Sequence, residues 1–158
     1  MPKGDKFELI SLHGRGRAEC LRMMLIIAGH PFIDMRFNLR QWHDFKRREK
    51  LSEDTKLPLL RVNDKKLIVG ASEIGRFLAL NLGFYGTSSI EQAEIEEIIS
   101  EIESLQSGLT PIIRTTLAKN FSQKTAYWNE YKEKTLNPVL EQLTQKLDNK
   151  NYFLGNRV

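Results

Sequence analysis

The sequence predicts a small α/β domain followed by a segment built only of helices. Short apolar runs that suit strands alternate with amphipathic helical stretches through residue 82, in the order β-α-β-α-β-β-α. Beyond a Gly- and Ser-containing stretch at 83–88, apolar residues recur at helical spacing. We therefore expect a domain with a four-stranded mixed sheet at 1–82, a linker at 83–88 and an all-helical domain at 89–158.

The first strand and helix are expected on either side of a glycine-containing turn. Apolar residues at 7–10 predict a strand, and Gly-Arg-Gly at 14–16 predicts a tight turn. The following helix would bury a face with i, i+3, i+4, i+7 spacing, formed by Leu21, Met24, Leu25 and Ala28. Gly29 lies where the C-cap of that helix is expected.

This strand–turn–helix unit is also a candidate anion site. A helix that begins at the end of a strand directs backbone N–H groups and the positive end of its dipole to that edge of the sheet. The turn adds Arg15 and Arg17. The alternative interpretation is a plain turn that carries two solvated arginines.

The rest of the first domain follows from short patterns. Residues 33–37 predict a second strand, and the very polar stretch from Trp42 to Lys50 is either a short helix or a loop. Two strands at 57–62 and 66–69 are separated by a turn. A helix is expected at 72–82, with Ser72 as its N-cap and an apolar face of Ile74, Phe77, Leu78 and Leu82.

Two long helical stripes make up the second domain. The first is formed by Ile95, Ile98, Ile99, Ile102, Leu105, Leu109, Ile112, Ile113 and Leu117. Pro111 is expected to kink or split this helix. The second stripe is formed by Tyr127, Tyr131, Leu136, Leu140, Leu143 and Leu147, and Pro138 implies another irregularity.

Composition narrows the possible classes of protein. The single cysteine, Cys20, excludes a disulfide framework within the chain, favours a reducing cytoplasmic location and is expected in the core. No apolar run approaches the length of a membrane span. No zinc spacing, P-loop or Ser-His-Asp pattern occurs, so we expect no metal. The net charge of +4 is dispersed apart from residues 46–48, which argues against nucleic-acid binding.

Four motifs together resemble those of the glutathione S-transferases. They are Arg-Gly-Arg-Ala-Glu at 15–19, a tryptophan at position 42, Lys-Leu-Pro at 56–58 and Ile-Gly-Arg-Phe-Leu at 74–78. The chain is most similar to the sigma class, with its prostaglandin D synthases and invertebrate relatives. The resemblance implies a thioredoxin-like domain that binds glutathione, a helical domain that shapes the electrophile site, and a homodimer.

The same resemblance assigns glutathione contacts to matching positions, namely Arg17, Trp42, Lys46, Lys56, Leu57 and Pro58. Trp42 and Lys46 match the pair that holds the glycyl carboxylate, and Lys56 matches a further carboxylate contact. Leu57 matches the residue whose backbone pairs with the cysteinyl group. Pro58 matches a cis-proline, although a trans proline at the start of a strand is the general alternative. Cationic groups and an indole N–H suit a ligand that carries two carboxylates.

Several positions depart from the family pattern. The catalytic tyrosine, which stabilises the glutathione thiolate, falls on Ser11, and a serine is a shorter donor. His13 is a candidate replacement donor because it should face the same side of the strand. The Gln-Ser pair that holds the γ-glutamyl group falls on 70–71, a Gly-Ala pair. A slip of one residue would instead give these roles to Ala71 and Ser72.

Two further departures lie in the helical domain. The aspartate that reaches glutathione across the dimer falls on Ser104, beside Glu103 as a partial substitute. The closing segment 153–158 matches the approach to a further helix, so the sequence is expected to be C-terminally shortened relative to the family. Each missing hydrogen bond to a charged group would weaken glutathione binding by about 1 kcal/mol or more.

Three hypotheses follow for the function of the chain. The first is a family member with impaired or absent glutathione conjugation that acts as a dimeric binding or interaction protein. The second is an active transferase that conjugates glutathione to electrophiles or isomerises a lipid, with thiolate stabilisation by Ser11, His13 or the backbone of 14–17. The third is an anion- or nucleic-acid-binding module, which rests only on the positive charge.

Overall fold

The computed structural model describes residues 4–155, and the chain forms two compact units, Met1–Tyr85 and Gly86–Val158. The first unit contains a four-stranded sheet in the order β2-β1-β3-β4. Its strands are β1 (Phe7–Leu12), β2 (Phe32–Phe37), β3 (Leu59–Val62) and β4 (Lys66–Val69). β1 pairs with β2 in parallel, whereas β1–β3 and β3–β4 are antiparallel. The predicted mixed sheet is therefore confirmed, with β3 beginning at Leu59 rather than at residue 57.

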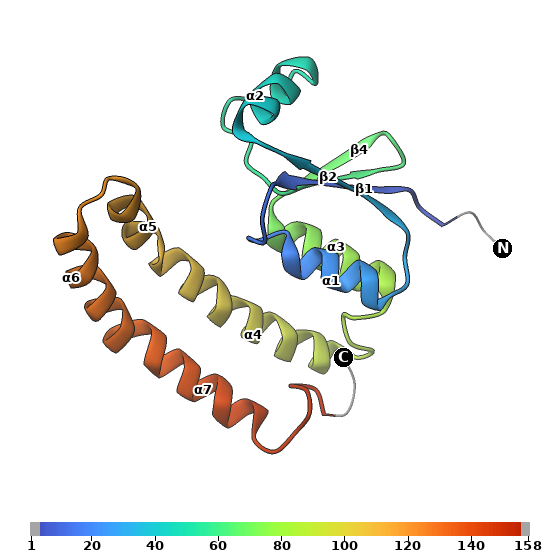
Figure 1. Cartoon of the computed structure of the whole chain (residues 1–158). Coiled ribbons are helices and arrows are strands. Elements are labelled where there is room, and N and C mark those ends of the chain that lie inside the picture. The colour runs from blue at the N-terminus through green and yellow to red at the C-terminus, as the bar shows by residue number, and fades with distance from the viewer. Residues whose placement is uncertain (1–3, 156–158) are drawn as a thin grey trace. The chain divides into compact units, whose positions relative to one another are not determined.

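Helices cover both faces of this sheet (Figure 1). Helices α1 (Glu19–Ile27) and α3 (Ala71–Leu82) pack on one face, and α2 (Leu39–Arg48) packs on the other. The core under α1 and α3 consists of Phe7, Leu9, Ala18, Leu21, Leu25, Leu60, Val62, Ile74 and Leu78. The core under α2 consists of Ile10, Trp42, Phe45 and Leu59. Alternation along β1 thus sends neighbouring side chains to two different cores.

The polar stretch that the sequence left open is helix α2. Its first turn is closed by a capping box, in which the Asn38 side chain accepts from the Gln41 N–H and the Gln41 side chain accepts from the Asn38 N–H. Trp42 and Phe45 are buried on its inner face. Local capping and two aromatic anchors stabilise a helix whose outer face is highly charged.

Four details of the first unit differ from the sequence predictions. Ala28 is exposed, and the buried face of α1 contains Arg22 instead. Helix α3 begins at Ala71 after Gly70, so Ser72 lies inside the first turn and is not the N-cap. The N-cap Gly70 has φ of 96°, a conformation that favours glycine. The expectation that Cys20 fills the core is also wrong, because this residue is exposed.

The second unit is a chain of helices. They are α4 (Ser89–Gly108), α5 (Thr110–Leu117), α6 (Phe121–Tyr131), the π-helix η1 (Lys132–Leu136) and α7 (Asn137–Leu147). Pro111 lies in the first turn of α5, so the long predicted helix is split. Pro138 lies in the first turn of α7, directly after the π-helix, which is the irregularity that the sequence implied.

One aromatic residue and one lysine connect the helices of this unit. The buried Tyr131 donates from its hydroxyl to the Leu105 carbonyl at 2.9 Å. Lys146 of α7 forms ion pairs with Glu97 and Glu101 of α4 at 2.9 and 2.6 Å. Neither α4 nor α7 has a buried residue, so the core of this unit is thin. Among residues 4–155, no helix is long and apolar enough to cross a membrane.

Candidate functional site

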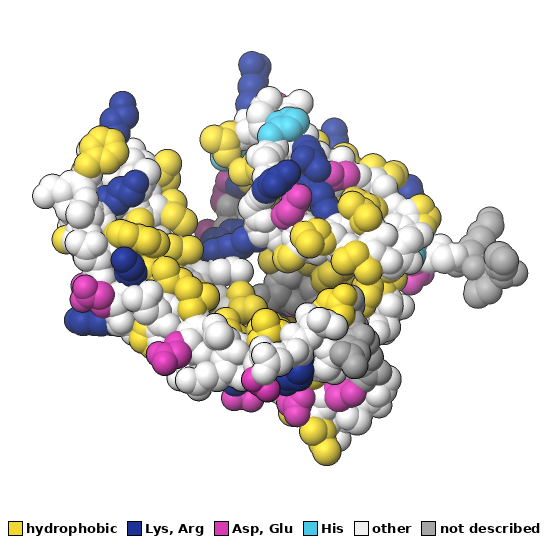
Figure 2. Space-filling model, turned by 60° about the horizontal axis from the view of Figure 1, so that its bottom comes forward, with side chains coloured by type: hydrophobic (Ala, Val, Ile, Leu, Met, Phe, Trp, Pro, Cys, Tyr) yellow, Lys and Arg dark blue, Asp and Glu magenta, His cyan; other side chains and the backbone are white. Residues whose placement is uncertain are grey.

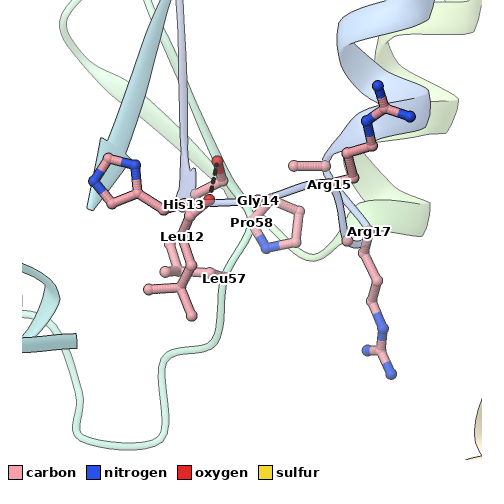
Figure 3. Close-up of a pocket in the computed structure, with 10 residues that line it drawn as sticks. Leu12, His13, Gly14, Arg15, Arg17, Leu57 and Pro58 are labelled. Carbon is pink, nitrogen blue, oxygen red and sulfur yellow. Dashed lines mark hydrogen bonds between the residues drawn. The ribbon is translucent and has the colours of Figure 1, made fainter. Parts of the chain in front are cut away.

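A pocket of about 320 Å³ lies where the end of β1, the following turn and the segment before β3 meet (Figure 3). It is lined by Ser11, Leu12, His13, Gly14, Arg15, Gly16, Arg17, Ala18, Leu57 and Pro58. Five of the predicted site residues therefore come together, namely Ser11, His13, Arg17, Leu57 and Pro58. The strand–turn–helix unit and the segment before β3 build one concave surface.

The turn owes its shape to two glycines. Gly14 and Gly16 have φ angles of 105° and 36°, which side chains other than glycine rarely adopt. The chain then enters α1, and the Glu19 N–H donates to the Gly16 carbonyl at 3.0 Å. Arg15 and Arg17 are exposed and extend from this turn in opposite directions (Figure 3). Both guanidinium groups face solvent, and the Arg15 Nε lies 3.9 Å from a carboxylate oxygen of Glu19.

Ser11 lies at the base of the pocket, and its side chain is already engaged. It is 4% exposed, its Oγ accepts a hydrogen bond from Arg22 Nη2 at 2.6 Å, and its hydroxyl donates to the Leu12 carbonyl at 3.3 Å. The hydroxyl therefore points along the strand instead of standing free in the pocket. To donate to a bound thiol, the Ser11 hydroxyl would have to give up its hydrogen bond to the Leu12 carbonyl.

Arg22 is the residue near the site that the sequence reasoning missed. Its side chain is 4% exposed and its Nε lies 3.1 and 3.0 Å from the two carboxylate oxygens of Asp34. Its Nη1 donates to Glu19 Oε2 at 2.8 Å. A signal was present, because an arginine stood one position beside the apolar stripe of α1 and an aspartate interrupted the apolar strand β2.

His13 lies at the rim of the pocket. Its backbone N–H donates to the Phe37 carbonyl at 2.9 Å and extends the parallel β1–β2 pairing by one bond. Its ring is exposed and lies on the opposite side of Gly14 from Arg15 and Arg17 (Figure 3). A ligand in the pocket can reach this ring from solvent.

The peptide bond between Leu57 and Pro58 is cis, which decides between the two alternatives that the sequence left open. Pro58 is buried, and its carbonyl accepts from the Gly70 N–H at 3.0 Å. This hydrogen bond between Gly70 and Pro58 places the start of β3 beside the start of α3. Leu57 is half-buried and forms part of the pocket wall.

Trp42 and Lys46 are buried in α2 and do not line this pocket. The Lys46 ammonium lies 5.7 Å from the centroid of the Trp42 ring. It donates to the carbonyl and to one carboxylate oxygen of Glu53, each at 2.9 Å. The hydrogen bond and the charge of Lys46 lower the pKa of Glu53 below its ordinary value, with smaller contributions from His43 and Arg47.

The remaining predicted residues lie elsewhere. Lys56 is exposed, and Ala71 and Ser72 are half-buried in the first turn of α3; none of the three lines the pocket. Glu103 belongs to α4 in the second unit. Desolvation raises the pKa of the Cys20 thiol, so its reactive thiolate is disfavoured. Within the described residues no group of three His, Cys, Asp or Glu side chains is arranged to hold a metal ion.

Comparisons with known proteins support the family that the motifs suggested. No family model matches the sequence. S-crystallin SL11 of Nototodarus sloanii is 27% identical over 137 residues, which cover 82% of this chain and 65% of the relative. The class-mu 28 kDa glutathione S-transferase of Schistosoma japonicum is 33% identical over 104 residues, which cover 63% of this chain and 49% of the relative. The chain thus spans less than two thirds of the length of these curated relatives.

A solved structure extends the match over nearly the whole chain. The sigma-class glutathione S-transferase of Fasciola hepatica superposes with a TM-score of 0.80 and 31% identity, over 98% of this chain and 73% of that one. The sheet with helices on both faces is thus the thioredoxin-like domain of this fold, followed by its helical domain. On this likeness and the motifs at the pocket, the chain belongs to the glutathione S-transferase superfamily.

Proposed function

We propose that this chain is a glutathione S-transferase-like binding protein whose glutathione-conjugating activity is impaired or absent. The observation that carries the proposal is the position of Ser11 at the base of the pocket. Its hydroxyl is buried, bonded to Arg22 and directed to the Leu12 carbonyl. Conjugation requires a thiolate, and a donor turned away from the bound sulfur would not favour one.

Part of a glutathione site remains in this proposal. Arg17, the Leu57 backbone and the cis Pro58 stand at the pocket, and exposed guanidinium groups suit carboxylates. Gly70 and Ala71 offer no polar side chain to a γ-glutamyl group. We therefore expect weak binding of glutathione or another small anionic ligand, with apolar contacts from Leu12 and Leu57.

Calorimetric titration with glutathione, combined with a conjugation assay on an activated chloronitrobenzene, tests this function. We expect a dissociation constant in the millimolar range and turnover at the rate of the uncatalysed reaction. Ser11→Ala should leave that rate unchanged because the hydroxyl does not serve the sulfur. Turnover well above background that is lost in Ser11→Ala would overturn the proposal.

An active transferase is the second candidate, and one observation favours it. Both Ser11 and His13 line the pocket that holds Arg17 and the cis Pro58, so a rotated hydroxyl or the imidazole would face a bound thiol. In that case His13→Ala or Ser11→Ala lowers kcat more than it raises KM. The same assay therefore separates the two functions.

The assembly and location of the protein are part of the same proposal. The resemblance implies a homodimer, and the single cysteine favours a cytoplasmic location. Sedimentation of the purified chain at micromolar concentration tests the dimer. A dedicated nucleic-acid module has less support, because the face shown by Figure 2 carries acidic and hydrophobic side chains as well as basic ones. Binding of DNA with a steep salt dependence would speak for it.

A further inference from the structure

A buried lysine of α2 takes its counter-charge from the loop that follows the helix. The side chain of Lys46 is 6% exposed, and its ammonium donates to both the carbonyl and a carboxylate oxygen of Glu53, each at 2.9 Å. The Leu51 N–H donates to the Lys46 carbonyl at 2.9 Å, which starts the loop directly from the end of the helix. A desolvated ammonium needs such a partner, because an unpaired buried charge is strongly unfavourable.

The partner is held much less firmly than the lysine. The Glu53 side chain is 83% exposed. Within residues 4–155, its salt bridge is the one with Lys46. An exposed carboxylate bound at one end exchanges readily with solvent and contributes little net free energy. The carboxylate on Lys46 is thus replaceable, whereas the ammonium is fixed by its burial against Trp42.

We propose that Glu53 occupies Lys46 in place of a ligand carboxylate and has to be displaced before such a ligand binds there. This inference rests on the proposed function and extends its weak glutathione site to Lys46, which lies in α2 outside the pocket. Glu53 then lowers affinity selectively for ligands that bring a terminal carboxylate. The Glu53 carboxylate competes with a ligand carboxylate for Lys46 and so determines which class of ligand binds. The loop that carries Glu53 continues through Leu57 and Pro58, which line the pocket.

The test is the affinity of three proteins for two ligands. The proteins are the full-length wild type, Glu53→Gln and Asp54→Asn, and the ligands are glutathione and its glycyl ethyl ester. Glutamine keeps the length of the side chain and an oxygen for Lys46 but removes the competing charge. Asp54 is the exposed neighbour, so its amide variant controls for a general change of charge. Circular dichroism checks that all three are folded.

We expect Glu53→Gln to bind glutathione about threefold to tenfold more tightly than wild type, in line with an exposed ion pair that is displaced. Asp54→Asn should stay within about twofold of wild type. The ester should gain nothing from Glu53→Gln because its glycyl end carries no charge. Equal affinity of wild type and Glu53→Gln, including no binding to either, overturns the inference, and so does an equal gain for the ester.

A different measurement, the conjugation activity of the wild-type chain, decides whether the proposed function fails. It fails if the wild-type chain conjugates glutathione well above background, whatever Glu53→Gln does. The ratio of affinities between Glu53→Gln and wild type tests the inference alone.

Discussion

Arg22 determines what Ser11 can do. The guanidinium binds Asp34 through Nε, Glu19 through Nη1 and Ser11 through Nη2, so one side chain joins α1, β2 and the end of β1. Its charge is already paired with two carboxylates within the fold. Arg22 therefore acts as a buried connector and not as a cation for an incoming anion, and it fixes the serine oxygen as an acceptor.

Replacing this connector should destabilise the fold much more than replacing its exposed neighbour. We expect Arg22→Met to lower the free energy of unfolding by about 2–3 kcal/mol, because it leaves Asp34 and Ser11 without a buried partner. Arg36 pairs with the same Asp34 at 2.7 Å but is 40% exposed. Arg36→Met should therefore change stability by about 0.5 kcal/mol or less.

Urea denaturation of both variants measures the difference. If Arg36→Met proved as destabilising as Arg22→Met, the burial of Arg22 would not be what stabilises the contacts of α1 with β1 and β2.

Residue identities near the pocket were predictable where motifs mark the backbone, but not where contacts come from distant segments. The turn glycines and Pro58 follow from local sequence, and the structure places them together at the pocket. Arg22 was missed because helical periodicity was counted on apolar residues alone. The pairing of Lys46 with Glu53 depends on how a loop folds back, which no periodic pattern reports.

At the scale of elements, Tyr131 fills the place where α4 ends. A Cβ built on Gly108 would lie 2.6 Å from Tyr131 Cε2, closer than real Cβ contacts. The ring and the residue without a side chain fit each other, and this close approach joins the end of α4 to α6. The sequence predicted an irregularity from Pro111 but left kink and split open, because a proline alone permits both.

Two glycine substitutions should therefore have opposite effects. Gly108→Ala should lower the free energy of unfolding by about 1 kcal/mol, since overpacking against Tyr131 exceeds the gain in helix propensity. In α3, a Cβ on Gly75 would meet Leu21 Cδ2 at an ordinary 3.8 Å. Gly75→Ala should raise stability by about 0.5 kcal/mol.

Thermal unfolding followed by circular dichroism measures whether each substitution lowers or raises the stability of the fold. Stabilisation by Gly108→Ala would show that the ring of Tyr131 moves aside without loss.

The same tyrosine predicts a dependence on alkaline pH. Burial raises the pKa of Tyr131 above its ordinary value of 10.0, so the folded state favours the neutral phenol. Its contribution to stability is complete below pH 10.0 and is lost as the pH rises through the raised pKa. Tyr131→Phe should be less stable by about 1 kcal/mol at pH about 7, owing to the lost hydrogen bond to Leu105.

That difference should shrink at pH about 10.5, because only the wild type has a phenol at position 131 that ionises more readily in the unfolded chain than in the fold. Urea denaturation at both pH values measures it. Tyr152→Phe is the control, since Tyr152 is 44% exposed. A difference between wild type and Tyr131→Phe that is independent of pH would contradict the burial argument.

On the scale of the whole molecule, the two units are stabilised differently. The first has two buried cores on either side of its sheet, whereas α4 and α7 of the second have no buried residue. Hydrophobic periodicity predicted both architectures because burial follows local pattern. It overestimated the burial of apolar side chains in the second unit. A continuous stripe of isoleucines and leucines determines the period of a helix but not which residues cover it.

The position of β1 in the middle of the sheet bears on how the protein is synthesised. Phe7 pairs with Val62, so β1 leaves the ribosome well before β3, its antiparallel partner. At about 5–20 residues per second the delay is roughly 3–10 s. During that time the edge of β1 that will pair with β3 presents unpaired N–H and C=O groups to other chains. Newly made chains would therefore need protection from aggregation until the third strand appears.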